Sequence, residues 1–150
     1  MTTHGPTAMT ELHSRMNDGI QVRMLWREPD ATPDQGLYQW FAFHWAPTER
    51  NPQDRFVSWG LVYPGLLPGR DTDVFGFYGA YGHFSSAQRR AQEAAGVPGQ
   101  VYEMVLEVNY RINVLPWFYF QPDIQGIINP GAAGQIDNAL VLAMQFGVPF

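Results

Sequence analysis

The chain has 150 residues and a net charge of −5 at pH 7, which fits a single domain and excludes the basic footprint of a nucleic-acid-binding protein. It contains no cysteine, so a disulfide scaffold and thiolate metal sites are excluded as well. Charged residues make up only 15% of the chain, whereas soluble domains have about 25%. No segment approaches the roughly 18 apolar residues of a transmembrane helix, and residues 1–17 lack the apolar core of a signal peptide.

Apolar and polar residues alternate in most of the chain, which predicts strands with two different faces. Residues 1–19 have no clear period and are predicted to be a loop or disordered lead-in, followed by one domain over residues 20–150. The predicted strands are 20–27, 37–46, 56–63, 73–84, 101–113, 117–128 and 138–150. Strands joined consecutively favour an all-β, antiparallel up-and-down meander of about seven strands.

Three further segments have their own signals. The glycine-rich strand 73–84 is expected to turn Phe75, Phe77 and Tyr81 outward. The longest connection, 85–100, is predicted to hold a short helix with Ser86 as its N-cap. The connection 47–55 is polar and carries two prolines, so it is predicted to be a loop.

The final strand is apolar at every second position up to the end of the chain, from Leu140 to Phe150. A soluble protein seldom ends on such a face, whereas the strands of a membrane β-barrel need only about 9–11 residues and present their apolar face to lipid.

Two architectures are compatible with this alternation: a soluble β-sandwich and a membrane barrel. Charges in the middle of the polar strand faces favour the barrel, because a wet lumen accommodates them; they are Arg23, Glu107, Arg111 and Asp123. Aromatic residues at strand ends also favour it, since membrane barrels carry aromatic girdles at both interfaces; they are Trp26, Trp45, Tyr63, Tyr102, Trp117 and Phe150.

Several segments together resemble the C-terminal part of the carbohydrate-selective porins of Gram-negative outer membranes, the OprB family. They include residues 26–29 (WREP), 60–70 (GLVYPGLLPGR), 73–76 (DVFG), 80–82 (AYG), 107–111 (EVNYR), 116–117 (PW), 121–125 (QPDIQ), 128–131 (INPG) and 138–142 (NALVL), with Phe150. They occur in order from about residue 20 to the end of the chain.

The resemblance implies a location in the outer membrane and a barrel of sixteen strands that passes sugars by diffusion. Seven strands would be the C-terminal portion of such a transmembrane barrel, because a sheet with open edges is not tolerated in lipid. The chain end would be periplasmic and the connections 47–55, 85–100 and 129–137 extracellular. Phe150 resembles the C-terminal signal read by the outer-membrane assembly machinery.

In this family context, the polar strand faces are expected to bind sugars weakly, through planar hydrogen-bonding groups beside aromatic rings. The candidate sugar-lining residues are Arg23, Arg27, Tyr38, Trp40, His44, Glu107, Asn109, Arg111, Tyr119, Gln121, Asp123 and Gln125. The parity of the hairpin 101–128 predicts that Glu107 lies opposite Asp123, Asn109 opposite Gln121 and Arg111 opposite Tyr119, with a slip of two residues possible.

Opposed carboxylates at Glu107 and Asp123 leave a retaining glycosidase open as an alternative, since such enzymes hold two carboxyl groups about 5–5.5 Å apart. A soluble carbohydrate-binding β-sandwich that stacks sugars on Trp40, Trp59 or Trp117 is a second alternative. The histidines, His4, His13, His44 and His83, lack metal-ligand spacing. We therefore expect no enzyme activity, cofactor or metal, and expect sugars, outer-membrane lipid and the assembly machinery as partners.

Overall fold

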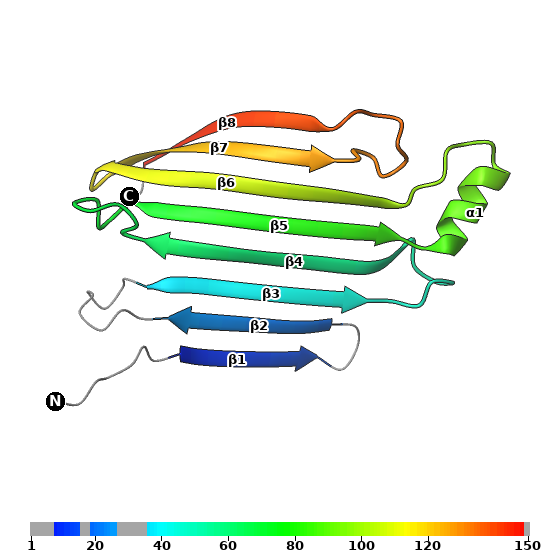
Figure 1. The fold of residues 1–150 in the computed structure, drawn as a ribbon, viewed down its shortest axis with the longest axis horizontal. Helices are drawn as coiled ribbons and strands as arrows, with labels where there is room; N and C mark the ends of the chain where they lie inside the picture. Colours follow the sequence, from blue (N-terminus) through cyan, green and yellow to red (C-terminus); the bar gives the residue numbers. More distant parts are fainter. Residues whose placement is uncertain (1–7, 16–18, 27–35, 149–150) are drawn as a thin grey trace.

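The structure, a computed structural model, describes residues 8–15, 19–26 and 36–148, with no side chains described for 8–15 and 19. It is an eight-stranded sheet in the order β1-β2-β3-β4-β5-β6-β7-β8, with every neighbouring pair antiparallel (Figure 1). The elements are β1 (Ala8–Arg15), β2 (Gly19–Trp26), β3 (Leu37–Trp45), β4 (Gln53–Pro64), β5 (Val74–Phe84), α1 (Ser86–Ala94), β6 (Tyr102–Leu115), β7 (Phe118–Ile128) and β8 (Ala139–Gly147). The predicted up-and-down meander is confirmed.

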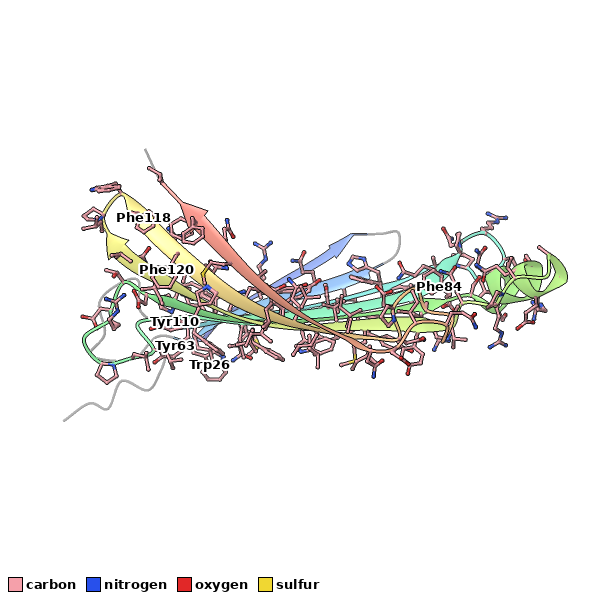
Figure 2. The ribbon with its side chains drawn as sticks, turned by 90° about the horizontal axis from the view of Figure 1, so that it is seen from above. Trp26, Tyr63, Phe84, Tyr110, Phe118 and Phe120 are labelled. Carbon is pink, nitrogen blue, oxygen red and sulfur yellow. The ribbon has the colours of Figure 1, made fainter. Side chains whose placement is uncertain are left out.

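The sheet is a single layer, curved and twisted, without a second layer over either face (Figure 2). Among the described residues, Ala42 and Ala132 are the only buried hydrophobic side chains, whereas Leu140 is 72% exposed and Phe146 65%. A β-sandwich needs two sheets that bury their apolar faces against each other. The sandwich alternative is therefore wrong for this chain.

Strand β1 corrects the prediction for residues 1–19. That segment was expected to be a loop or disordered lead-in, but Ala8–Arg15 pairs along its whole length with β2, from Ala8 opposite Trp26 to Arg15 opposite Gly19. Backbone hydrogen bonds to the edge of a neighbouring strand do not require alternating side chains, which is why the periodicity of the sequence missed this strand. The same reason applies to β4, which begins at Gln53 inside the predicted loop 47–55 and has a register irregularity between Gln53 and Arg55.

The connections with the most structure lie at one end of the sheet, where α1 is found (Figure 1). The N-cap of α1 is Ser85, whose hydroxyl accepts from the backbone N–H of Gln88 at 3.1 Å, so the prediction of Ser86 was one residue late. Gly96, just beyond the helix, has φ +77°, a conformation that glycine adopts without strain. The backbone N–H of Val101 donates to the carbonyl of Ala132 at 2.7 Å, which joins the connection after α1 to the one between β7 and β8.

No helix in the described part of the chain is both long and apolar enough to cross a membrane.

Candidate functional site

The pairing register separates the side chains of β2–β8 into two faces of opposite character. Directly paired residues share a face, and the face alternates along each strand. We call one the polar face; its polar and aromatic members include Gln21, Arg23, Tyr38, Trp40, His44, Phe56, Ser58, Tyr78, Glu103, Glu107, Asn109, Arg111, Asn113, Tyr119, Gln121, Asp123, Gln125 and Gln145. We call the other the apolar face; it includes Val22, Met24, Phe41, Phe43, Trp59, Leu61, Phe77, Leu106, Val108, Phe120, Ile124, Leu142 and Phe146.

Eleven of the twelve candidate lining residues lie in the described strands, and all eleven fall on the polar face. The twelfth, Arg27, lies outside the described residues, and so does Phe150. Polar-face residues outside the candidate set include Gln21, Ser58, Tyr78, Glu103 and Gln145. Tyr78 could have been found, because the outward placement of Phe77 already turns its neighbour inward.

One row of residues crosses the polar face from β2 to β7. Arg23 pairs with Trp40, Trp40 with Gly60, and Gly60 with Tyr78. The row continues from Tyr78 to Glu107 and then to Gln125. A cationic group, two aromatic rings and an acidic group therefore lie side by side on consecutive strands.

The register between β6 and β7 differs by two residues from the predicted one. Glu107 lies opposite Gln125 and Asn109 opposite Asp123, so the predicted opposition of Glu107 to Asp123 is wrong. The predicted pairings of Asn109 with Gln121 and of Arg111 with Tyr119 are also wrong, since Tyr119 lies opposite Asn113. The irregularity between Asn113 and Leu115, next to the two-residue connection, sets a register that parity alone could not specify.

The new register gives Glu107 hydrogen-bond donors on both sides. Nδ2 of Asn109 donates to one carboxylate oxygen at 2.9 Å, and Nε2 of Gln125 donates to the other at 3.3 Å. Asp123 is now a diagonal neighbour of Glu107 instead of its direct partner, although the two carboxyl groups still lie close enough to interact. The glycosidase alternative depended on directly opposed carboxylates, and the register does not supply that pairing.

A second cluster on the polar face is built around Tyr119. The guanidinium carbon of Arg111 lies 3.7 Å from the centre of the Tyr119 ring, which is a cation–π contact. Nε of Arg111 donates to Oδ1 of Asn113 at 3.2 Å, and Nε2 of Gln145 donates to the Tyr119 hydroxyl at 3.4 Å. A Cβ added at Gly147 would come within 2.2 Å of the Tyr119 ring, so this glycine makes room for the ring. Neighbouring side chains of the polar face thus hold Arg111 and Tyr119 in place.

The end of the sheet away from α1 is fastened by Asp73, which is 1% exposed. Arg70 donates to both carboxylate oxygens of Asp73, at 2.7 and 2.8 Å, and the backbone N–H of Asn113 donates to Asp73 at 3.0 Å. The hydrogen bond with Asp73 raises the pKa of Arg70, which stays charged. The connection between β4 and β5 is therefore tied to the end of β6.

The end of the sheet next to α1 has its own buried polar contact. Nδ1 of His83 lies 2.6 Å from Oδ1 of Asp54, and Asp54 is buried. The backbone N–H of Ser85 donates to the carbonyl of Pro52 at 2.8 Å. These contacts hold the start of β4 against the end of β5.

The described histidine and acidic side chains do not gather into one cluster. Within residues 20–26 and 36–148, no three histidine, aspartate or glutamate side chains form a group that could hold a metal ion. His44 and His83 lie on different faces of the sheet. His44 pairs with Phe56 and His83 with Arg55, and these two adjacent residues of β4 point to opposite faces.

Comparison with known proteins identifies the family. The model of the carbohydrate-selective porin, OprB family, matches residues 14–150 of the chain. The chain belongs to this family. The resemblance on which the sequence argument relied is confirmed, and with it the outer-membrane location, since OprB porins are outer-membrane proteins.

The chain matches only part of the length of two relatives. Porin B of Pseudomonas aeruginosa is 28% identical over 113 residues, which cover 67% of this chain and 25% of that protein. The high-pH structure of Pseudomonas putida OprB superimposes with a TM-score of 0.73 at 28% identity, covering 87% of this chain and 34% of that one. The chain therefore spans about a quarter of Porin B and about a third of the P. putida structure, and its sheet is part of a porin β-barrel.

The apolar face of this OprB-family sheet has the features of a surface that meets lipid. Its strands carry aromatic residues near their ends, and Figure 2 shows Trp26, Tyr63, Tyr110, Phe118 and Phe120 gathered toward the end away from α1. On this face Tyr81 stacks on Tyr102, and Phe118 on Phe146, with ring centroids 5.7 and 6.4 Å apart. Aromatic girdles at the membrane interfaces are a regular feature of outer-membrane barrels.

Proposed function

We propose that the polar face lines a water-filled channel through which sugars diffuse passively across the outer membrane. The observation that carries this proposal is the separation of the two faces by register across β2–β8. A barrel with this polarity presents apolar side chains to lipid and polar side chains to a wet lumen. The matching family model, which is that of carbohydrate-selective porins, supports sugars as the solute.

The chemistry of the polar face suits weak contact with sugars. A sugar offers hydroxyl groups that both donate and accept, together with an apolar face of C–H groups. Carboxylate, amide and guanidinium groups can meet the hydroxyls, and aromatic rings can meet the C–H face. Because Glu107 and Arg111 already have partners within the sheet, a passing sugar exchanges contacts without leaving a buried charge unpaired. Such a wall favours passage over tight binding, and the proposal includes no catalytic step, cofactor or metal.

Each face of the sheet would have its own partner in this proposal. Outer-membrane lipid covers the apolar face, and sugars contact the polar face. The two edge strands of the described sheet, β1 and β8, are each paired on one side only, and lipid does not tolerate unpaired strand edges. We call the closed assembly in which both edges are paired the native barrel. The assembly machinery would recognise its C-terminal strand, with Phe150 as the signal.

A liposome-swelling assay on the native barrel tests the function. Vesicles containing the barrel should swell in isotonic glucose much faster than protein-free vesicles, and the rate should fall as the sugar becomes larger. Swelling no faster than in protein-free vesicles would contradict the proposal.

Two wall variants separate passive transport from the glycosidase alternative. Neither Glu107→Gln nor Asp123→Asn should abolish glucose swelling, because passive diffusion through a water-filled lumen needs no catalytic carboxylate. Each substitution removes one negative charge from the wall, so each should lower the ratio of cation to anion permeability in bilayer recordings. Recovery of hydrolysed oligosaccharide from the vesicles, lost in both variants, would favour the enzyme instead.

A further inference from the structure

The apolar face carries basic side chains at one place. Across the paired positions of β2–β8 on that face, only Arg55 and His83 have a charged or imidazole side chain. They are direct partners on β4 and β5, at the end of the sheet next to α1 (Figure 1). We call these two residues the basic pair.

The row that contains the basic pair is otherwise aromatic. Trp45 on β3 pairs with Arg55, and Tyr102 on β6 pairs with His83. Trp45 is 46% exposed and stacks on Phe43, with ring centroids 5.6 Å apart. On the lipid face of a barrel, aromatic rings mark the interface, and arginine is tolerated there far better than at the bilayer midplane. The basic pair therefore lies at the depth of the lipid headgroups.

A buried carboxylate orients the basic pair without occupying it. Nδ1 of His83 lies 2.6 Å from Oδ1 of Asp54, so Nε2, on the other side of the ring, is left for another partner. A guanidinium nitrogen of Arg55 is 3.6 Å from Oδ2 of Asp54, too far for a hydrogen bond, and no hydrogen bond to another described residue holds this guanidinium. The side chains of Arg55 and His83 are 58% and 26% exposed.

The chemistry of the basic pair fits a phosphate group. A guanidinium presents paired N–H donors that match two phosphate oxygens, and a charged imidazole donates from both of its nitrogens. Toward the middle of the sheet, the next residue of β4 on this face is Val57, which lies between Phe43 and Tyr81. Donors for an anion are thus continuous with an apolar surface, as a molecule with a phosphate and acyl chains requires.

We propose that the basic pair binds the phosphate of a membrane lipid, whose acyl chains lie on the apolar face beside Val57. The lipid belongs to the leaflet on the α1 side of the sheet. The inference rests on the assignment of the apolar face to lipid in the proposed function. It goes beyond that function, because the passage of sugars does not require a specific lipid site on the outside of the barrel.

The test is a titration of the native barrel in neutral detergent with dioleoyl phosphatidic acid, followed by native mass spectrometry. Arg55→Gln should raise the dissociation constant by about tenfold, the equivalent of about 1.4 kcal/mol. Arg55→Lys keeps the charge but not the paired donors, so its constant should lie between the two. His83→Asn keeps an N–H donor for Asp54 but removes Nε2, and it should also raise the constant.

The matched control is Arg90→Gln. Arg90 is exposed on α1, at the same end of the sheet, so this variant removes an equal charge and should leave the dissociation constant unchanged. Dioleoyl phosphatidylcholine has the same chains but a choline on its phosphate, and it should bind more weakly. Inorganic phosphate lacks the chains and should not displace phosphatidic acid at equal concentration.

Each result decides one part of the inference. Unchanged binding in Arg55→Gln, or an equal loss in Arg90→Gln, would overturn the basic pair as the site. Equal affinity for phosphatidylcholine would overturn recognition of the phosphate, and displacement by inorganic phosphate would overturn the lipid as the ligand. Glucose swelling of the same barrels keeps the two proposals apart: unmodified barrels that swell while the site fails leave the channel intact, whereas barrels that do not swell overturn the channel itself.

Discussion

Two valines on strand β6 allow a direct measurement of which face meets lipid. Val108 lies on the apolar face, 41% exposed, between Phe77 on β5 and Ile124 on β7. Val105 lies three residues away on the polar face, between Ala80 and Ile127. Val108→Arg and Val105→Arg introduce the same side chain in place of the same residue, on the same strand, but on opposite faces.

The surroundings set the expected magnitudes. Arginine on the lipid face of an outer-membrane barrel costs about 2–4 kcal/mol near the bilayer midplane. Both direct neighbours of Val108 are apolar, so an arginine there would have no acidic group beside it. Val108→Arg should therefore lower the ratio of folded to unfolded barrel by a factor of about 30 to about 700, at about 1.4 kcal/mol per factor of ten.

Val105→Arg should be nearly neutral. Glu103 and Glu107 occupy the preceding and following positions of the same face, so the new guanidinium would lie near two carboxylates in a wet environment. Changes of this kind alter stability by about 0.5 kcal/mol or less.

The assay is reversible guanidinium titration of the native barrel in phospholipid vesicles, followed by tryptophan fluorescence, with the free energy of unfolding as the result. Glucose swelling of the refolded vesicles checks that each variant forms the same barrel. Equal losses in the two variants, or a larger loss for Val105→Arg, would refute the assignment of the two faces and with it the placement of the channel wall.

Three further predictions concern the ends of the strands. Asp73→Asn should lower the free energy of unfolding by about 1.5–3 kcal/mol, because it weakens charged hydrogen bonds to Arg70 and Asn113. Asp71→Asn, at an exposed position, is the control. Equal denaturation curves for the two variants would argue against a stabilising role of Asp73. Ser85→Ala should cost about 1 kcal/mol through loss of the α1 N-cap, seen as faster amide exchange in α1 with β5 unchanged, while unaltered exchange in α1 would contradict it. Phe150→Asp should reduce the amount of barrel assembled in outer membranes, measured by heat-modifiable electrophoresis, without changing glucose swelling per assembled barrel; normal assembly would remove the role assigned to Phe150.

Much of the architecture could be predicted because a strand imposes a period of two on its side chains. The alternation in residues 101–113 assigned Glu107 and Val108 to opposite faces, and backbone pairing preserves that assignment. The separation of a polar from an apolar face is therefore a property of the sequence. So is the meander, since short connections favour the pairing of consecutive strands.

The register of those strands was decided only by the tertiary structure. Parity is unchanged by a slip of two residues, so the sequence could not distinguish Asp123 from Gln125 as the partner of Glu107. The irregularity next to the connection between β6 and β7 fixed the choice, and it converted an opposed pair of carboxylates into a carboxylate held by two amides.

Strand β1 and the contact between the rings of Trp40 and Tyr78 depended on the tertiary structure for a related reason. Residues 8–15 form a strand because they pair with the edge of β2. Such pairing does not require alternating apolar and polar residues within the segment, so the sequence pattern does not predict it. Trp40 and Tyr78 are far apart in the chain and come together because Gly60 leaves room for a ring between their strands. The sequence by itself determined which face each residue occupies, whereas the register determined which residues meet across it.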